Sequence, residues 1–259
     1  GVGLHVVHDA VRAAATAGEL PLVVGGDHSI AAGSISAAAS VHEGLAVVWV
    51  DAHADANTPA TSPSGNFHGM PAACLLGWFG EDGLPPGFSE WMPARGCLPE
   101  DRLAYIGLRD VDVTERQLLR ESRCLALSMR EVDRYGIATV VEMAIKAIDP
   151  RGERPIWLSL DVDAVDPHFA PGTGTMARGG LTYREIHYVC EELAATGRLV
   201  GMDLVEVNPA LEEQARGSGT GVGRAAPVMH GDDPAVSATS ETVRLAVELI
   251  LSALGKTIL

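Results

Sequence analysis

The sequence predicts an α/β fold built on a mostly parallel sheet. Short apolar runs of strand length alternate with segments whose apolar residues recur at helical spacing. Polar and glycine-rich stretches follow several of these runs, which is where open parallel sheets bind their ligands. The 259 residues are 47% hydrophobic, enough to form the core of one large domain. Since no repeat or boundary divides the chain, residues 1–259 are interpreted as a single domain.

The first half of the chain supplies two strands and three helices. A helix is expected over residues 5–18, followed by the strand LPLVV and an alanine-rich helix that begins near Asp27 or Ser29. The run VVWV is a second strand. The stretch 57–71 is rich in Pro, Gly, Ser, Thr and Asn, so a loop is expected there. A helix over 72–78 and a surface segment rich in Gly and Pro complete this half.

The second half continues the alternation. The runs LAYIGL and CLALSM predict strands, and residues 131–148 predict a helix. PIWLSL predicts another strand, followed by a helix over 182–195 and a last strand, RLVGMDLVE, that ends at Glu206. Residues 212–237 lack any periodicity, so a mobile surface loop is expected. Residues 239–254 predict a closing amphipathic helix.

Composition and charge narrow the function classes. The net charge of −15 argues against nucleic acid or an anionic membrane as a partner. No apolar run approaches the roughly 18 residues of a membrane span, so a soluble protein is expected. The chain shows no signal peptide or transit signature, which favours the cytoplasm, with mitochondria as an alternative. Four cysteines without a CxxC pair are interpreted as reduced core thiols: Cys74, Cys97, Cys124 and Cys190.

Charged residues follow the strand VVWV at every second position. They are Asp51, His53 and Asp55. Because side chains alternate along an extended backbone, all three are expected to point the same way. Carboxylate and imidazole groups suit manganese or a similar divalent ion. A hydrated acidic turn after a strand is the alternative interpretation of this segment alone.

Other strand ends add residues of the same types. His28 follows the strand LPLVV, and Asp161 and Asp163 follow PIWLSL two positions apart. Four aspartates in one cleft would repel each other, and two divalent cations would balance their charge. Such a pair of ions holds a shared water and lowers its pKa. The alternative, in which each aspartate is a loop or cap residue, requires three coincidences. The candidate metal ligands are therefore His28, Asp51, His53, Asp55, Asp161 and Asp163.

Three motifs resemble the ureohydrolases, the family of arginase, agmatinase and related guanidino hydrolases. The motifs are GGDHS, DAHAD and SLDVDAVDP, and the resemblance runs from the start of the chain to Pro209 and resumes in the last helix. It implies a three-layer α/β/α fold and a centre of two Mn²⁺ ions. By position, His28 and Asp55 would complete the shell of the first ion and His53 and Asp163 that of the second. Asp51 and Asp161 would bridge the two.

The loops resemble those of arginase, which acts on L-arginine. In SGNFHGMP and the preceding segment, the resemblance assigns the α-carboxylate of the substrate to Asn57, Ser64 and Asn66. RDVDVTE resembles the arginase segment that receives the α-ammonium group, which maps to Asp112 and Glu115. Ordinary turn chemistry is the alternative for Ser64 and Asn66. Thr175 resembles a threonine of the family that contacts bound ligand, with a turn role as its alternative.

The mechanism implied is attack of a metal-bridging hydroxide on the guanidinium carbon, which yields L-ornithine and urea. Glu206 would pair with the guanidinium group, and His68 would carry a proton to the leaving amine. Asp55 is counted with them among the catalytic residues. Two alternatives are an agmatinase or other guanidino hydrolase and an inactive metal-binding subunit.

Two further expectations come from the family. Ureohydrolases usually begin with an additional strand, a loop and a helix before GGDHS, whereas only one helix precedes it here. The chain is therefore expected to lack this N-terminal unit, and the strand that leads to His28 is expected to have an unpaired side. Members of the family commonly assemble as trimers or hexamers, so a homotrimer or homohexamer is expected.

Overall fold

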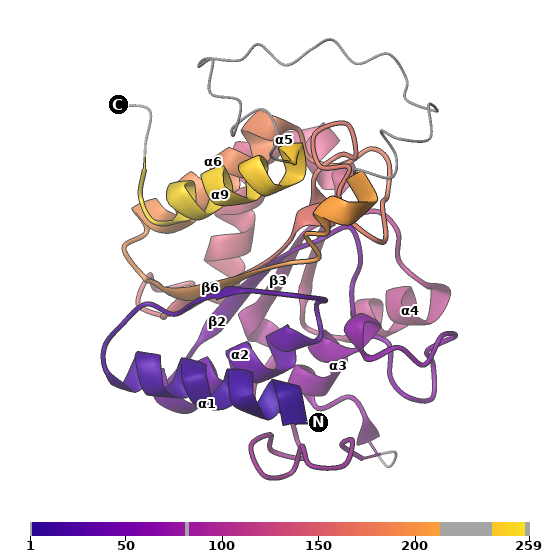
Figure 1. Ribbon diagram of the computed structural model, residues 1–259, viewed down its shortest axis with the longest axis vertical. Coiled ribbons are helices and arrows are strands. Elements are labelled where there is room, and N and C mark those ends of the chain that lie inside the picture. Colours follow the sequence, from indigo (N-terminus) through magenta and orange to yellow (C-terminus); the bar gives the residue numbers. More distant parts are fainter. Residues whose placement is uncertain (1, 81–82, 213–239, 257–259) are drawn as a thin grey trace.

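The computed structural model describes residues 2–80, 83–212 and 240–256. Its centre is a six-stranded parallel sheet in the order β1-β6-β5-β2-β3-β4 (Figure 1). The strands are β1 (Leu22–Val24), β2 (Ala46–Val50), β3 (Leu103–Leu108), β4 (Leu125–Ser128), β5 (Ile156–Asp161) and β6 (Leu199–Val205). Because every strand runs the same way, the residues that follow them gather along one edge of the sheet.

Helices cover both faces of this sheet. In Figure 1, α1, α2 and α3 lie on one face and α5, α6 and α9 on the other. The helices are α1 (Val2–Thr16), α2 (Ile30–Val41), α3 (Pro71–Leu76), α4 (Val113–Glu121), α5 (Met129–Ile148), α6 (Tyr183–Ala195) and α9 (Glu241–Ala253). The three-layer α/β/α fold with a mostly parallel sheet is therefore confirmed.

The strand β2 shows how the two cores are divided. All five of its residues are buried. Val48 and Val50 join the cluster under α5 and α6, whereas Val47 and Trp49 join the cluster under α1, α2 and α3. A strand covered on both faces needs no polar alternation, which explains its continuous apolar run.

Capping motifs fix the starts of three helices on the ligand side. Ser128 with Glu131 and Thr182 with Glu185 form capping boxes at α5 and α6. Another capping box begins α4, a helix that the sequence interpretation did not separate from the charged residues before it. The helix α5 changes direction at Gly136, whose φ of 76° is not helical.

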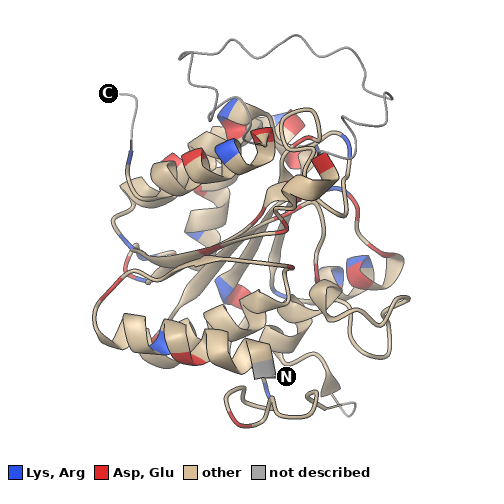
Figure 2. Ribbon diagram, in the orientation of Figure 1, with Lys and Arg blue, Asp and Glu red and all other residues tan. Residues whose placement is uncertain are grey.

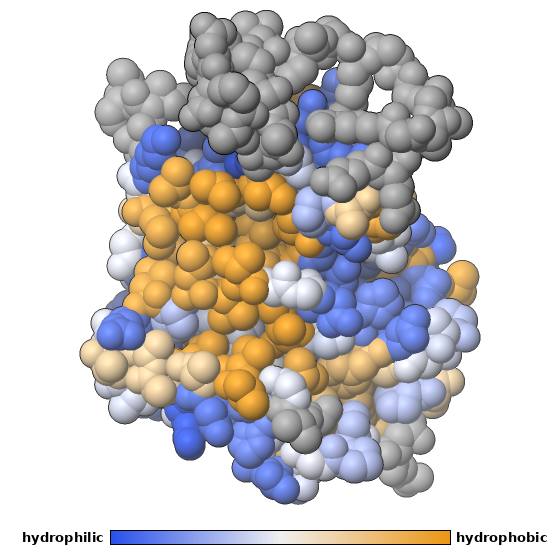
Figure 3. All heavy atoms as spheres, viewed as in Figure 1, coloured by the Kyte–Doolittle hydropathy of each residue, from blue (hydrophilic) through white to orange (hydrophobic). Residues whose placement is uncertain are grey.

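The strand β1 lies at the edge of the sheet and pairs with β6 alone among the described strands. Leu22 and Val24 are 40% and 64% exposed. In Figure 3, hydrophobic side chains gather on the face between α1 and α9. Val247 and Leu251 of α9 are exposed as well. The expected unpaired side of this strand is thus present among the described residues.

All four cysteines are free thiols, but only Cys74 and Cys190 are fully buried. No helix within the described ranges is long and apolar enough to cross a lipid bilayer. Charged residues of both signs are interspersed on the outer helices (Figure 2). The loop expected over 212–237 lies, apart from its first residue, outside the described residues.

Candidate metal centre and substrate pocket

Two neighbouring strands bring the central aspartates together. β2 and β5 are paired in parallel with Val50 opposite Leu160, so Asp51 and Asp161 emerge side by side. Both are buried, at 0% and 3% exposure. A third candidate metal ligand, His28, lies between β1 and α2. The carboxyl edge of the sheet therefore places residues from distant parts of the sequence around one point.

Asp51, His53 and Asp55 were expected to point the same way because they alternate along an extended backbone. This reason was wrong, although the side chains do converge. β2 ends at Val50, and the following residues form a loop in which Asp55 has a φ of 49°. Asp163 lies in a short 3-10 turn, Val162–Ala164, beyond β5. The side chains converge because these turns redirect them. Asp51 and Asp161 each accept a hydrogen bond from the backbone N–H two residues later, at 2.7 and 2.8 Å.

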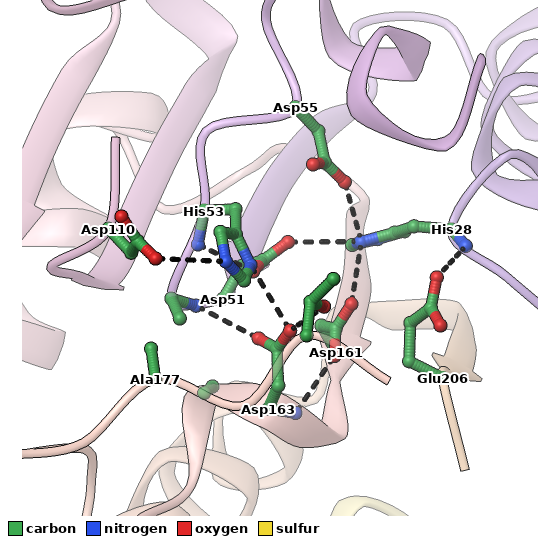
Figure 4. Close-up of polar contacts among 12 residues, drawn as sticks. His28, Asp51, His53, Asp55, Asp110, Asp161, Asp163, Ala177 and Glu206 are labelled. Carbon is green, nitrogen blue, oxygen red and sulfur yellow. Dashed lines mark hydrogen bonds and ion pairs between the residues drawn. The ribbon is translucent and has the colours of Figure 1, made fainter. Parts of the chain in front are cut away.

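The predicted ligands form two groups that share Asp51 (Figure 4). His28 Nδ1 lies 3.0 Å from Asp51 Oδ2, 2.9 Å from Asp55 Oδ2 and 3.3 Å from Asp161 Oδ2. His53 Nδ1 lies 3.4 Å from Asp51 Oδ1 and 3.1 Å from Asp163 Oδ2. All six predicted ligands are thus brought together. Asp161 belongs only to the group around His28, whereas Asp51 belongs to both.

The charges in this cluster favour a bound cation. Burial and the neighbouring Asp163 and Asp51 carboxylates raise the pKa of Asp161 well above its usual value. Burial, with the Asp51 charge, raises the pKa of Asp55 to about 7. For His53 burial acts the other way, but Asp163 and Asp51 still raise its pKa to about 12. Positive charge is therefore strongly stabilised among these carboxylates.

The nitrogen His28 Nδ1 gives a direct test of fit for a metal. It is buried, faces the three carboxylate oxygens described above, and forms no hydrogen bond with any residue that the structure describes. An imidazole nitrogen and hard carboxylate oxygens are a donor set that suits Mn²⁺ and similar divalent ions. The residues present therefore fit a divalent cation on this side of Asp51.

A cavity of about 200 Å³ opens beside the ligands. All the predicted site residues line it except Asp51, Asn66 and Asp163. Asp51 and Asp163 lie behind it at 0% and 1% exposure, whereas Asn66 lies outside on the exposed loop. Ser64 Oγ accepts a hydrogen bond from the Asn66 backbone N–H at 3.2 Å, which is turn chemistry. Asp110, which was not assigned a role, also lines this cavity.

The lining of the cavity also includes Asp112 and Glu115, two acidic residues at the start of α4. Asn57 Nδ2 donates to Asp112 Oδ2 at 2.9 Å, which fixes this carboxylate at the cavity. The two oxygens of Glu115 accept the backbone N–H groups of Ala56 and Asp112, both at 2.9 Å. Burial raises the pKa of Glu115. Glu115 therefore connects the loop after β2 to the start of α4. Of the two carboxylates, Asp112 is the one more available to a ligand.

Three more predicted residues surround the cavity. Glu206, with a φ of 63°, follows β6 and accepts the His28 backbone N–H at 3.0 Å. His68 Nδ1 lies 3.6 Å from Glu206 Oε1. Thr175 Oγ1 donates to Asp163 Oδ2 at 2.9 Å, so it is tied to a candidate metal ligand.

The structure also reveals supporting residues that the sequence analysis missed. Trp49 Nε1 donates to Asp51 Oδ2 at 3.0 Å, and its ring stacks on His28 with centroids 4.2 Å apart. Arg109 donates to backbone carbonyls of the turn that carries Asp163. Asp203 lies fully buried within β6. A charged residue inside an apolar strand was the signal available for Asp203, because burial of an unmatched carboxylate is costly.

Comparison with known proteins agrees with this geometry. The model of the Arginase family matches residues 2–255. The arginase of Eremothecium gossypii is 51% identical over 211 residues, which are 82% of this chain and 52% of that protein. The arginase of Glaciozyma antarctica is 43% identical over 254 residues, covering 98% of this chain and 66% of that one. The chain thus spans between about half and two thirds of the length of these relatives.

Solved structures lead to the same family. The crystal structure of arginase from Bacillus subtilis superimposes with a TM-score of 0.81 at 34% identity, covering all of this chain and 80% of that one. The family model extends over nearly the whole sequence, and it includes every strand that carries a candidate ligand. On this evidence the chain belongs to the arginase family.

Proposed function

We propose that this chain hydrolyses L-arginine to L-ornithine and urea at a centre of two Mn²⁺ ions. The observation that carries the proposal is the sharing of Asp51 by two ligand groups beside an acidic cavity. His28 and Asp55 would hold one ion and His53 and Asp163 the other, with Asp51 and Asp161 between them. Two such ions supply positive charge and lower the pKa of a shared water near the substrate carbon.

The cavity suits a substrate with a guanidinium group at one end. Glu206 is held by the His28 backbone N–H and lines the cavity, where a guanidinium can form a charge-assisted pair with its carboxylate. His68, within 3.6 Å of Glu206, is the group that would hand a proton to the leaving amine. No step of this scheme requires a covalent bond between substrate and protein.

The opposite end of the cavity would receive the amino-acid group. Asp112 would pair with the α-ammonium group, and Asn57 orients Asp112 through its amide. Glu115 is assigned a supporting role at the same end because its oxygens are taken by backbone N–H groups. Ser64 at the cavity and Asn66 on the adjoining loop would receive the α-carboxylate, which agmatine lacks. Thr175 would act through Asp163.

Turnover of L-arginine and agmatine by the Mn²⁺-loaded chain tests this proposal. We expect a strong preference for L-arginine, and Ser64→Ala or Asn66→Ala should raise the KM for L-arginine by about ten- to a hundredfold, since each removes a hydrogen bond to a charged group. The KM for agmatine should hardly change. Ser40→Ala, remote from the cavity, is the control. Preferential turnover of agmatine would favour the agmatinase alternative, and bound metal without turnover of either substrate would favour the inactive metal-binding subunit. Absence of bound metal in folded protein would contradict the proposed centre.

We also propose a homotrimer or homohexamer in a reducing compartment. The exposed apolar residues Val247 and Leu251 of α9 support assembly, and the four free thiols support the compartment. Arg184 pairs with Glu191 of its own helix at 3.2 Å, so it contributes less to this proposal. Light scattering at micromolar concentration tests assembly, and a fully active monomer would contradict it.

A further inference from the structure

A chain of buried hydrogen bonds runs from the candidate metal site into the core. It begins at His28, passes through Ser159 of β5 and ends at Asp203 of β6, which lies opposite Ser159 in the sheet register. His28 is 1% exposed, and Ser159 and Asp203 are fully buried. No lysine or arginine in the described part of the chain forms an ion pair with Asp203. Its carboxylate therefore depends on hydrogen bonds.

Three donors surround the Asp203 carboxylate. Trp157 Nε1 and Ser34 Oγ donate to Oδ2 at 2.7 and 2.9 Å, and Ser159 Oγ donates to Oδ1 at 2.6 Å. Burial raises the pKa of Asp203, and each of these hydrogen bonds favours the ionised form. The indole N–H of Trp157 can only donate, so Oδ2 must remain an acceptor.

The donor and the acceptor of each hydrogen bond between His28, Ser159 and Asp203 follow from counting protons. The Ser159 hydroxyl has one proton, which it donates to Asp203 Oδ1. Its oxygen can then only accept from His28 Nε2, 2.9 Å away, so Nε2 carries the proton. In the neutral imidazole, which is the form that binds a cation, the lone pair is then on Nδ1, the nitrogen that faces the carboxylates of Asp51 and Asp161.

We infer that Asp203 is a positioning residue for metal binding, which acts through Ser159 to hold His28 in the tautomer whose Nδ1 can bind a cation. The inference rests on the proposed metal centre. Partners of this kind, placed behind a histidine ligand, typically change metal affinity by about 10- to 100-fold. If Asp203 only filled space in the core, an isosteric change would leave metal affinity unaltered.

The variant Asp203→Asn tests the inference because it should exchange donor and acceptor in the hydrogen bonds of Ser159. Trp157 requires an acceptor, so the amide oxygen must take the Oδ2 position and the amide NH₂ must face Ser159. Ser159 would then donate to His28 Nε2, and the proton of His28 would move to Nδ1, the metal side. We expect one of the two Mn²⁺ ions to bind about 10- to 100-fold more weakly.

Two further variants distinguish a positioning role of Asp203 from a role in core packing. Ser34→Ala removes a donor to Asp203 but leaves the bond from Ser159 intact, so both ions should bind as in the wild type. In Asp203→Asn combined with Trp157→Phe, the amide can rotate and present its oxygen to Ser159. The NH₂ can then donate to Ser34, whose hydroxyl can turn to the Ala31 carbonyl, 3.5 Å away. Metal affinity should recover in this double variant, although its stability should fall.

Binding is measured by titrating metal-free protein with Mn²⁺ and following the electron paramagnetic resonance of the free ion. Circular dichroism confirms that each variant is folded. Unchanged affinity in Asp203→Asn would overturn the inference, as would equal losses in Asp203→Asn and Ser34→Ala or failure of the double variant to recover. If the wild type itself bound no Mn²⁺, the proposed function would fail instead, so the two failures are distinguishable.

Discussion

Arg109 is expected to hold the turn that carries Asp163, and its removal should cost much of the chain's stability. Its Nη2 donates to the Asp163 carbonyl at 2.6 Å and to the Ala177 carbonyl at 2.8 Å. A third carbonyl, of Ala164, lies 3.1 Å from Nη1 but also accepts the Leu181 N–H. The carbonyls of Gly107 and Val165 also accept from Arg109, at 3.2 and 3.4 Å. In Arg109→Met the carbonyls of Asp163 and Ala177 therefore lose the two shortest of these charged hydrogen bonds.

The expected loss follows from these two bonds. A hydrogen bond to a charged group contributes about 1.5–3 kcal/mol, so two give about 3–6 kcal/mol if they add, and contacts so close together need not add. For a domain of this size, 1 kcal/mol corresponds to about 2–4 °C. The melting temperature of Arg109→Met should therefore fall by about 6–24 °C.

Urea unfolding of metal-free protein, followed by tryptophan fluorescence, measures this loss without a contribution from metal binding. Arg116→Met is the matched control. Arg116 is exposed and, within the described ranges, makes one hydrogen bond, to the Val111 carbonyl at 3.0 Å, so its loss should change stability by less than about 1 kcal/mol. If the two variants unfolded at the same urea concentration, the supporting role assigned to Arg109 would be wrong.

Three further predictions concern the site and the core. Thr175→Val should weaken binding of the ion near Asp163 by about 10- to 100-fold, measured by elemental analysis after dialysis. Thr173→Val, which removes a buried hydroxyl that has no hydrogen bond to the described part of the chain, should retain both ions, and equal metal contents would count against the role of Thr175. His68→Asn should lower kcat by about 10²- to 10⁴-fold with little change in KM for L-arginine; a change confined to KM would contradict proton transfer by His68. Burial alone would raise the pKa of Asp149, but backbone N–H groups and Arg198 hold it below its usual value. Its stabilisation should therefore be complete above about pH 4 and disappear as the pH falls through the lower folded pKa, so Asp149→Asn should destabilise the chain at pH 7 and converge with wild type in acid unfolding.

Local patterns in the sequence were sufficient to predict the layers of the fold and the residue types of the candidate metal ligands. Apolar runs of strand length, separated by helical spacing, predicted each of the six strands. In β2, β3 and β5 the run is continuous because a strand covered on both faces must be apolar throughout. The ends of those strands predicted the six candidate ligands, because parallel strands present their carboxyl ends at one edge. The helix α4 was missed, since its capping residues, Asp112 and Glu115, had been interpreted as substrate ligands.

Only the tertiary structure decided how those residues are supported. The contact between Ser34 and Asp203 joins positions 169 residues apart, and that between His28 and Ser159 joins positions 131 apart. Spacing along the chain fixes which face a side chain occupies within its own element, but strand order and register fix what lies opposite it. The sequence therefore determined which groups could bind metal, whereas the order β1-β6-β5-β2 determined that a buried carboxylate would stand behind His28.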